Sequence, residues 1–171
     1  APLMAVLARA ARRALPEALL DVVVGPLGDD PEAVRQALVD VGGVTLHIVP
    51  ESIHPLMLDA DLAVTAGGVT LCELAATGTP AVGVCLAQNQ RANLVGLDRA
   101  GALRFAGFAE DPGLPLAVEG VLAELAADAA RRRELGERAR RLVDGRGAFR
   151  VAQAMRERLA EASLGAGNRA C

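Results

Sequence analysis

Short apolar runs alternate along this chain with longer segments in which apolar residues recur every three or four positions. The short runs, bounded by turn residues, are typical of buried strands, and the recurring spacing is typical of helices. The predicted strands are Leu20 to Val24, Val44 to Val49, Leu62 to Thr65, Ala81 to Leu86 and Ala102 to Ala106. The predicted helices are Leu3 to Leu15, Asp30 to Gly42, His54 to Asp59, Val69 to Thr77 and Asn89 to Arg99, and only helical pattern follows Leu114.

This alternation predicts a doubly wound, Rossmann-like α/β domain. Strands separated by helices of about ten residues form right-handed βαβ units and a parallel sheet. The first predicted element is the helix from Leu3 to Leu15, whereas a doubly wound domain begins with a strand that carries a glycine turn. We therefore expect the first strand of the domain to be missing from this chain and to belong to a longer gene product.

From Leu114 onward the chain is predicted to be helical up to a short C-terminal tail. Breaks near Asp128 and at Gly145 to Gly147 divide the second half into three helical segments. The domain is expected to span residues 1–164, and the small and polar residues from Gly165 to Cys171 predict a disordered tail. The N-terminus has neither an initiator Met nor the layout of a signal peptide.

Composition narrows the class of protein. The 171 residues are 52% hydrophobic but include only three aromatic residues, all Phe, so Ala, Val and Leu must build the core. The net charge of −3 gives no overall bias toward nucleic acid or an acidic membrane surface. The Arg-rich segment from Arg131 to Arg150 is interleaved with acidic residues and is interpreted as a solvated helix face. No apolar stretch approaches the ~20 residues that a membrane span requires.

Metal, cofactor and several motif-based functions have no support in the sequence. Three cysteines lack metal-ligand spacing and there are only two His, so neither a metal nor a cofactor is expected. Unpaired cysteines favour a reducing compartment, and we expect a cytoplasmic protein. The chain lacks the P-loop, GxSxG and GxGxxG motifs. His47 is expected to be a core or face residue, and His54 to cap the short helix.

A glycine turn follows the third predicted strand, where open parallel sheets bind ligands. Gly67 and Gly68 allow the backbone to approach a ligand closely, and the amides of Gly68, Val69 and Thr70 would point outward at the positive end of the next helix. That arrangement suits a phosphate or diphosphate. An ordinary strand-to-helix turn explains the same residues.

The helix after this turn contains the pattern Thr70-x-x-Glu73. Ser or Thr followed by Glu at this spacing is the capping box, in which the carboxylate accepts a backbone N–H bond. Alternatively, Glu73 lies one helical turn from the glycines and could accept two ribose hydroxyls of a nucleotide. The spacing leaves both interpretations open.

Three consecutive amides, Gln88, Asn89 and Gln90, follow the fourth predicted strand. Amides suit sugar hydroxyls and N-acetyl groups because they donate and accept without adding charge. Asn89 could instead cap the next helix.

Taken together, residues 60–107 resemble the C-terminal domain of GT-B enzymes. The shared features, in matching order, are Ala60-Asp61-Leu62-Ala63-Val64, Ala66-Gly67-Gly68, Thr70-x-x-Glu73, Gly78-x-Pro80, Leu86-Ala87-Gln88-Asn89-Gln90 and Gly101-Ala102. The last amide-containing stretch looks most like the UDP-2,4-diacetamido-2,4,6-trideoxy-β-L-altropyranose hydrolases of pseudaminic acid biosynthesis. A related group is associated with spore-coat polysaccharide synthesis. The peptidoglycan N-acetylglucosaminyl transferases share the glycine turn, the Thr and the Glu, but not Asn89-Gln90.

The resemblance implies a UDP-sugar site at matching positions. It implies that Gly67, Gly68 and Val69 line the diphosphate, with Thr70 beside them, and that Glu73 holds the ribose. It further implies that the uracil rests near Val49 and Pro50. The sugar would face the three amides Gln88, Asn89 and Gln90.

The resemblance also implies what the chain lacks. In the hydrolases the N-terminal domain carries a His proposed to activate water, so no catalytic residue is assigned within this chain. Three hypotheses remain: the UDP-binding part of a nucleotide-sugar hydrolase, the donor-binding domain of a GT-B glycosyltransferase, and a non-catalytic domain that binds a ligand or a partner protein.

Overall fold

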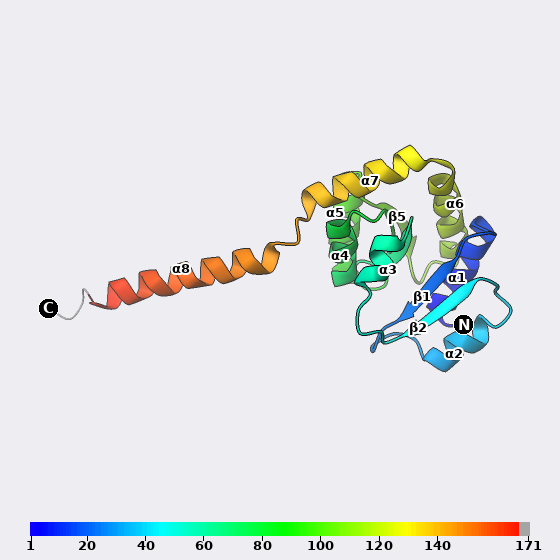
Figure 1. Ribbon diagram of the computed structural model, residues 1–171, viewed down its shortest axis with the longest axis horizontal. Helices are drawn as coiled ribbons and strands as arrows, with labels where there is room; N and C mark the ends of the chain where they lie inside the picture. The colour runs from blue at the N-terminus through cyan, green and yellow to red at the C-terminus, as the bar shows by residue number, and fades with distance from the viewer. Residues whose placement is uncertain (168–171) are drawn as a thin grey trace.

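The computed structural model describes residues 1–167, and within them the chain forms an α/β domain with parallel strands, which confirms the predicted fold class (Figure 1). The strands are β1 (Leu20–Val24), β2 (Val44–Ile48), β3 (Ala63–Ala66), β4 (Ala81–Cys85) and β5 (Arg104–Phe108). The helices are α1 (Leu3–Ala14), α2 (Pro31–Ala37), α3 (His54–Asp59), α4 (Val69–Thr77), the 3₁₀ turn η1 (Gln88–Gln90), α5 (Arg91–Arg99), α6 (Leu114–Ala127), α7 (Ala129–Leu142) and α8 (Gly147–Gly167).

The strands form two sheets, where the sequence predicts one. β1 pairs with β2, and β4 lies between β3 and β5, all in parallel. Each strand is four or five residues long, and β5 begins two residues later than the apolar run suggests. Ala102 and Leu103 are buried without joining the ladder, because they follow directly from the left-handed turn at Gly101.

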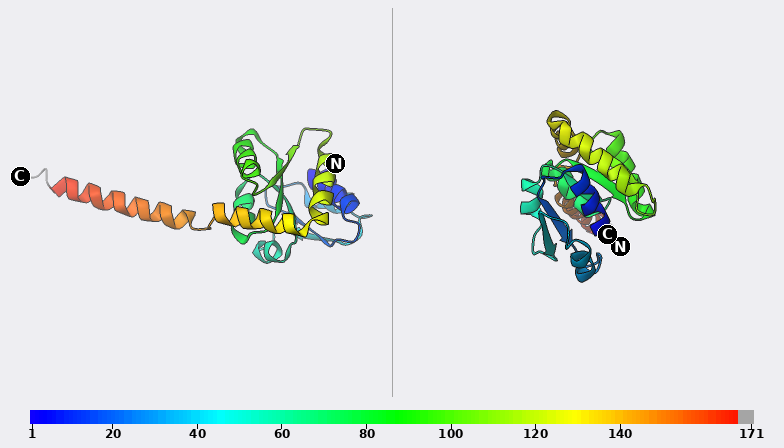
Figure 2. Two further views of the ribbon diagram at one scale, coloured as in Figure 1. Left: turned by 90° about the horizontal axis from the view of Figure 1, so that it is seen from above. Right: turned by 90° about the vertical axis from the view of Figure 1, so that its right-hand side faces the viewer.

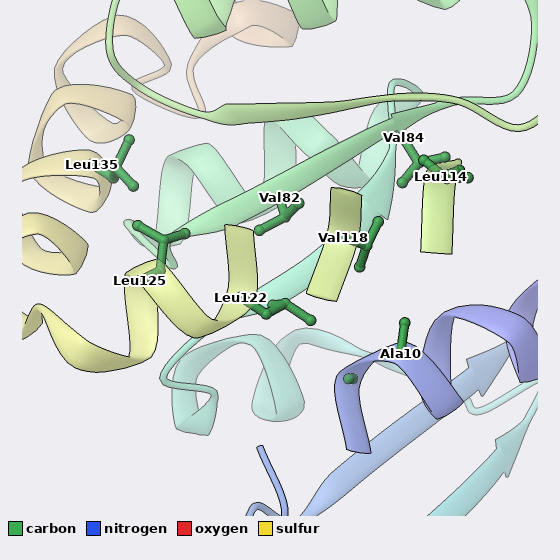
Figure 3. Packing of buried hydrophobic residues seen from close by; sticks show 9 residues of the cluster. Ala10, Val82, Val84, Leu114, Val118, Leu122, Leu125 and Leu135 are labelled. Atoms are coloured by element: carbon green, nitrogen blue, oxygen red, sulfur yellow. The ribbon is translucent and has the colours of Figure 1, made fainter. Parts of the chain in front are cut away.

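Alternate residues of β4 pack on two different helix layers. Val82 and Val84 belong to a cluster with α1 and α6, which Figure 3 shows from close by. Ala81 and Cys85 belong to a second cluster with α3, α4 and α5. Because successive side chains of a strand point to opposite faces, the three-stranded sheet is covered on both sides, as a doubly wound domain requires.

The two-stranded sheet is covered by helices on one face. Val22 and Val24 of β1 pack against Val34 of α2 and against α1. On the other face, the His47 ring nitrogen Nε2 lies 2.7 Å from Oδ1 of the half-exposed Asp21. His47 is therefore a face residue of the sheet.

Local signals fix the helix ends largely as the sequence predicts. Asp30 caps α2 by accepting the N–H of Glu32 at 3.3 Å, and Pro31 is the first helical residue. Gly78 ends α4 at φ 78°, a conformation that favours glycine. The α2 helix ends at Ala37, five residues before the predicted glycine stop, and a turn continues to Asp40.

The C-terminal half contains the three predicted helical segments. Asp128 caps α7 by accepting the N–H of Arg131, and Gly145 adopts φ 70° before α8. In Figures 1 and 2, α8 extends away from the rest of the molecule. The tail predicted from Gly165 begins within α8, and residues 168–171 lie outside the described residues. Among the described helices, none is long and apolar enough to cross a membrane.

Ion pairs cover the Arg-rich segment. Arg131 and Arg138 both pair with Glu134, and Arg150 pairs with Asp144 at 2.6 Å. The guanidinium of Arg131 hydrogen-bonds the Glu134 carboxylate and is the main cause of that carboxylate's lowered pKa. These contacts fit the interpretation of a solvated helix face.

Candidate functional site

A cavity of about 970 Å³ opens at the carboxyl ends of β1, β2 and β3. Its walls come from the loop after β1, the loop after β2, β3 itself, the first turns of α4 and one end of α1. Four of the ten predicted binding residues line it: Val49, Pro50, Thr70 and Glu73. These residues are separated by up to 24 positions in the chain, so the fold gathers them at one edge, where α/β proteins commonly bind ligands.

The N-terminus of α4 has no side-chain cap. Gly68 is the N-cap residue and Thr70 is the second residue of the helix, so the capping box allowed by the spacing does not form. The N–H of Leu71 bonds to the Gly68 carbonyl at 3.3 Å. The N–H groups of Val69 and Thr70 belong to the first turn, where no intrahelical acceptor exists. The positive end of α4 is thus available to an anion.

Glu73 lies one turn further along α4 and its side chain lines the cavity. It is exposed, and within residues 1–167 it has neither a hydrogen-bond partner nor an ion-pair partner. A free carboxylate in this position can accept hydrogen bonds from hydroxyl groups of a ligand.

Gly67 joins the glycine turn to the amide cluster. It is buried, and a Cβ atom placed on it would lie 2.8 Å from Leu94 Cγ and 2.9 Å from Gln90 Cβ. Glycine is therefore required where α5 packs against the turn. Gly68 differs, because a Cβ atom on it would meet nothing within 4 Å. Val69 is 76% exposed beside it. None of these three residues lines the cavity itself.

The three amides do not act together. Gln90 Oε1 accepts the N–H of Leu86 at 3.0 Å, so this side chain holds its own loop. Asn89 is exposed and does not cap α5. Gln88 lines a second, shallower hollow of about 520 Å³ together with residues of α5, including Arg91 and Arg99. The structure therefore leaves the amide cluster outside the main cavity.

Val49 has a strained backbone. It adopts φ 43°, and it is the sole non-glycine residue with positive φ in the described part of the chain. A β-branched residue in this region is an outlier, and its strained backbone costs of order 1–3 kcal/mol. Such strained residues cluster at functional sites. The Val49 N–H bonds to the Val24 carbonyl at 2.9 Å, which extends the β1–β2 ladder and fixes the turn into Pro50.

Several residues that line the cavity were not predicted from the sequence. They are the residues of the loop from Gly25 to Asp29, together with Glu51 and Ser52 after β2. The loop follows β1 and contains Gly25 and Gly28, so the rule that located Gly67 would have found it. Asp29 accepts the N–H of Met4 at 3.0 Å and so caps α1 from a distance.

His54 lines the cavity but does not cap α3 with its side chain. It is the first residue of that helix, and its N–H donates to Ser52 Oγ at 3.2 Å. The other ionisable side chains that line the cavity are Asp29, Glu51 and Glu73, so its walls carry more acidic than basic groups. Within residues 1–167 no group of three or more His, Cys, Asp or Glu side chains is placed to hold a metal ion.

A search of protein-family models and of curated proteins found no match to this chain. Among solved structures, the chain is similar to the crystal structure of the glycotransferase of kitacinnamycin, with a TM-score of 0.65 and 25% sequence identity. The similarity covers 88% of this chain and 38% of that chain. The α/β domain therefore matches part of a glycosyltransferase, and it spans well under half the length of that protein.

Proposed function

We propose that this chain is the nucleotide-sugar-binding part of a glycosyltransferase. The observation that carries the proposal is the open end of α4 beside an unpartnered carboxylate, at the carboxyl ends of parallel strands. The likeness to part of the kitacinnamycin glycotransferase supports it. An acceptor site and the residues that perform the chemistry would then come from outside residues 1–171.

In this proposal each end of a nucleoside diphosphate has a partner of suitable chemistry. The N–H groups of Val69 and Thr70 and the positive end of α4 bind the diphosphate. Glu73 accepts the ribose hydroxyls, and the base lies beside Val49 and Pro50. The fixed backbone at Val49 would present its peptide groups to the base without the entropy cost of ordering a loop.

A nucleotide-sugar hydrolase is the second candidate. It rests on the resemblance of the Leu86 to Gln90 stretch, which would place three amides against the sugar. Gln90 bonds to its own loop and Gln88 lines a different hollow, so the described geometry favours the transferase. UDP release from a diacetamido-sugar donor without any acceptor, measured on the longer gene product, would favour the hydrolase instead.

Calorimetric titration with UDP tests the binding site directly. Two hydroxyl bonds to an ionised carboxylate contribute roughly 2 kcal/mol in net terms, so Glu73→Ala should weaken UDP binding about 30-fold. Glu157→Ala on the exposed face of α8 is the matched control and should leave binding unchanged. Equal UDP affinity of Glu73→Ala and the unchanged protein, both folded by circular dichroism, would contradict the assigned site.

A further inference from the structure

Helix α8 carries an apolar surface that the domain does not cover. In Figure 1 and in the left view of Figure 2, the helix extends away from the sheets and from the other helices. Four of its large apolar side chains are between 60% and 69% exposed: Phe149, Val151, Met155 and Leu159. The other two Phe residues of the chain pack against the core instead. Large contiguous apolar surfaces are rare on monomeric proteins and mark interaction sites.

The first turn of α8 is held by local bonds. Asp144 accepts the N–H of Arg146 at 3.0 Å and the guanidinium N–H of Arg150 at 2.6 Å. Gly145 lies between them at φ 70°, a left-handed conformation that separates α8 from α7. These bonds fix where the helix begins and leave its apolar side chains uncovered.

Helical periodicity gathers the apolar residues of α8 on one face. Val151, Met155 and Leu159 follow one another at intervals of four positions, so they form a stripe along the helix. Ala152 lies on the same face, three positions before Met155. Phe149 lies at one border of this apolar stripe, three positions before Ala152.

The charges of α8 are sorted about the apolar stripe. Arg156 lies two turns after Phe149, and Arg158 lies two turns after Val151, so the two guanidinium groups flank opposite borders. Neither arginine forms an ion pair with another residue in the described part of the chain. Glu157, the acidic residue among positions 147–159, lies on the opposite face of the helix. The apolar stripe therefore has basic borders.

This arrangement is complementary to an anionic lipid surface. A helix that lies on a bilayer buries its apolar face at the boundary between headgroups and acyl chains, and its cations attract anionic lipids. Arginines at the borders of the stripe can bury their methylene groups and keep their guanidinium groups at the level of the headgroups. The whole chain has a net charge of −3, so this complementarity is a local property of α8.

A second copy of the chain fits the apolar stripe less well. Paired helices are held in register by opposite charges at the borders of their apolar seam. In a parallel pair, Arg156 and Arg158 of one copy would meet the same basic residues of the other. In an antiparallel pair they would meet the first turns of the partner helix, and within positions 147–159 no carboxylate flanks the stripe.

We propose that α8 lies on an anionic lipid surface. Val151, Met155 and Leu159 enter the boundary between headgroups and acyl chains, and Arg156 and Arg158 lie beside the headgroup phosphates. The residues that line the main cavity come from other elements, so the proposal stands apart from the proposed function.

Co-sedimentation of the 171-residue chain with vesicles tests the proposal. Vesicles of phosphatidylcholine alone are compared with vesicles in which about a third of the lipid is phosphatidylserine. Two arginines at the anionic surface should make binding to the second kind roughly 30-fold tighter. Salt at about 1 M should remove this difference. Equal binding to both kinds of vesicle, or binding to neither, would overturn the proposal. A dimer in sedimentation velocity without vesicle binding would assign the stripe to a second copy and would also overturn it.

A pair of charge variants separates insertion from simple attraction. Met155→Glu and Ala154→Glu add the same charge at neighbouring exposed positions, but only Met155 lies in the apolar stripe. Met155→Glu should weaken binding to the anionic vesicles at least about tenfold more than Ala154→Glu does, because a carboxylate would enter the acyl boundary. Both variants should keep the helix content of the unchanged protein by circular dichroism. Equal losses in the two variants would mean that net charge alone governs binding, against the proposal.

A tryptophan reporter gives an independent result. The chain has no Trp and no Tyr, so Met155→Trp introduces a single fluorophore within the apolar stripe. Its emission should move to shorter wavelength with anionic vesicles, because the indole enters an apolar environment. Gln153→Trp is the matched control on the opposite face, where Gln153 donates to Glu157 at 2.9 Å, and its emission should not move. Equal shifts in both variants, or a shift in neither, would contradict the proposed orientation of α8.

Discussion

Gly67 and Gly68 are adjacent glycines with opposite surroundings, and their alanine variants separate folding from binding. A Cβ atom at Gly67 would press on Leu94 and Gln90 at less than 3.0 Å. Leu94 is fully buried in the cluster that also contains Leu71, Leu74 and Leu103. Overpacking of this kind costs about 2 kcal/mol. For a domain of this size that cost lowers the thermal midpoint by roughly 4–8 °C.

Gly68→Ala should leave the fold almost unchanged. Its φ of −87° is accessible to alanine, and a Cβ atom there meets no protein atom within 4 Å. Alanine is a poorer N-cap than glycine, which costs about 0.5 kcal/mol. The new methyl group would, however, project where the proposed diphosphate approaches the Val69 and Thr70 amides. Loss of one or two bonds to a charged group should weaken UDP binding roughly 10- to 100-fold.

Thermal unfolding followed by circular dichroism and calorimetric titration with UDP measure the two effects on the same samples. The reasoning is refuted if Gly68→Ala binds UDP as tightly as the unchanged protein. It is equally refuted if Gly67→Ala is as stable as Gly68→Ala, since the overpacking at Gly67 should cost more than the weaker N-cap at Gly68.

Two further predictions concern stability. Gly136→Ala would place a Cβ atom 2.1 Å from the Gly78 carbonyl oxygen, so α7 must move away from α4. The free energy of unfolding, measured by denaturant titration, should fall by about 3 kcal/mol. Gly120→Ala on α6, where a Cβ atom meets nothing within 4 Å, is the control and should leave that free energy unchanged or raise it. Arg104 hydrogen-bonds Glu124 and thereby holds the pKa of that carboxyl below its ordinary value of 4.5. A lowered pKa stabilises the fold above pH 4.5, and the contribution is lost as the pH falls through the folded-state value. Glu124→Gln should therefore lower the free energy of unfolding by about 0.5 kcal/mol at pH 7, a small value because the pair is partly exposed. Well below pH 4.5 the variant and the unchanged protein should be equally stable. An equal difference in stability at both pH values would exclude this pair as the cause.

Sequence alone determined the order and type of the elements. Apolar runs gave the strands, and Asp30, Gly78 and Asp128 set helix ends, because capping and left-handed glycine turns depend on a few adjacent residues. Two of the alternatives to ligand binding, the Thr70 capping box and an Asn89 cap, were also local hypotheses. The structure contradicts these two, because α4 begins at Val69, too early for a Thr70 cap, and Asn89 does not cap α5.

Only the tertiary structure decided where distant segments meet. Sequence periodicity is the same for a central strand and an edge strand, so it could not show that β1 and β3 are each paired on one side only within residues 1–167. Nor does local pattern reveal that Val49 is held at positive φ, because the strain is maintained by the bond to Val24 on another strand. The glycine turn and Glu73 were visible in the sequence, but the cavity that joins them to Pro50 exists only once parallel strands align their carboxyl ends.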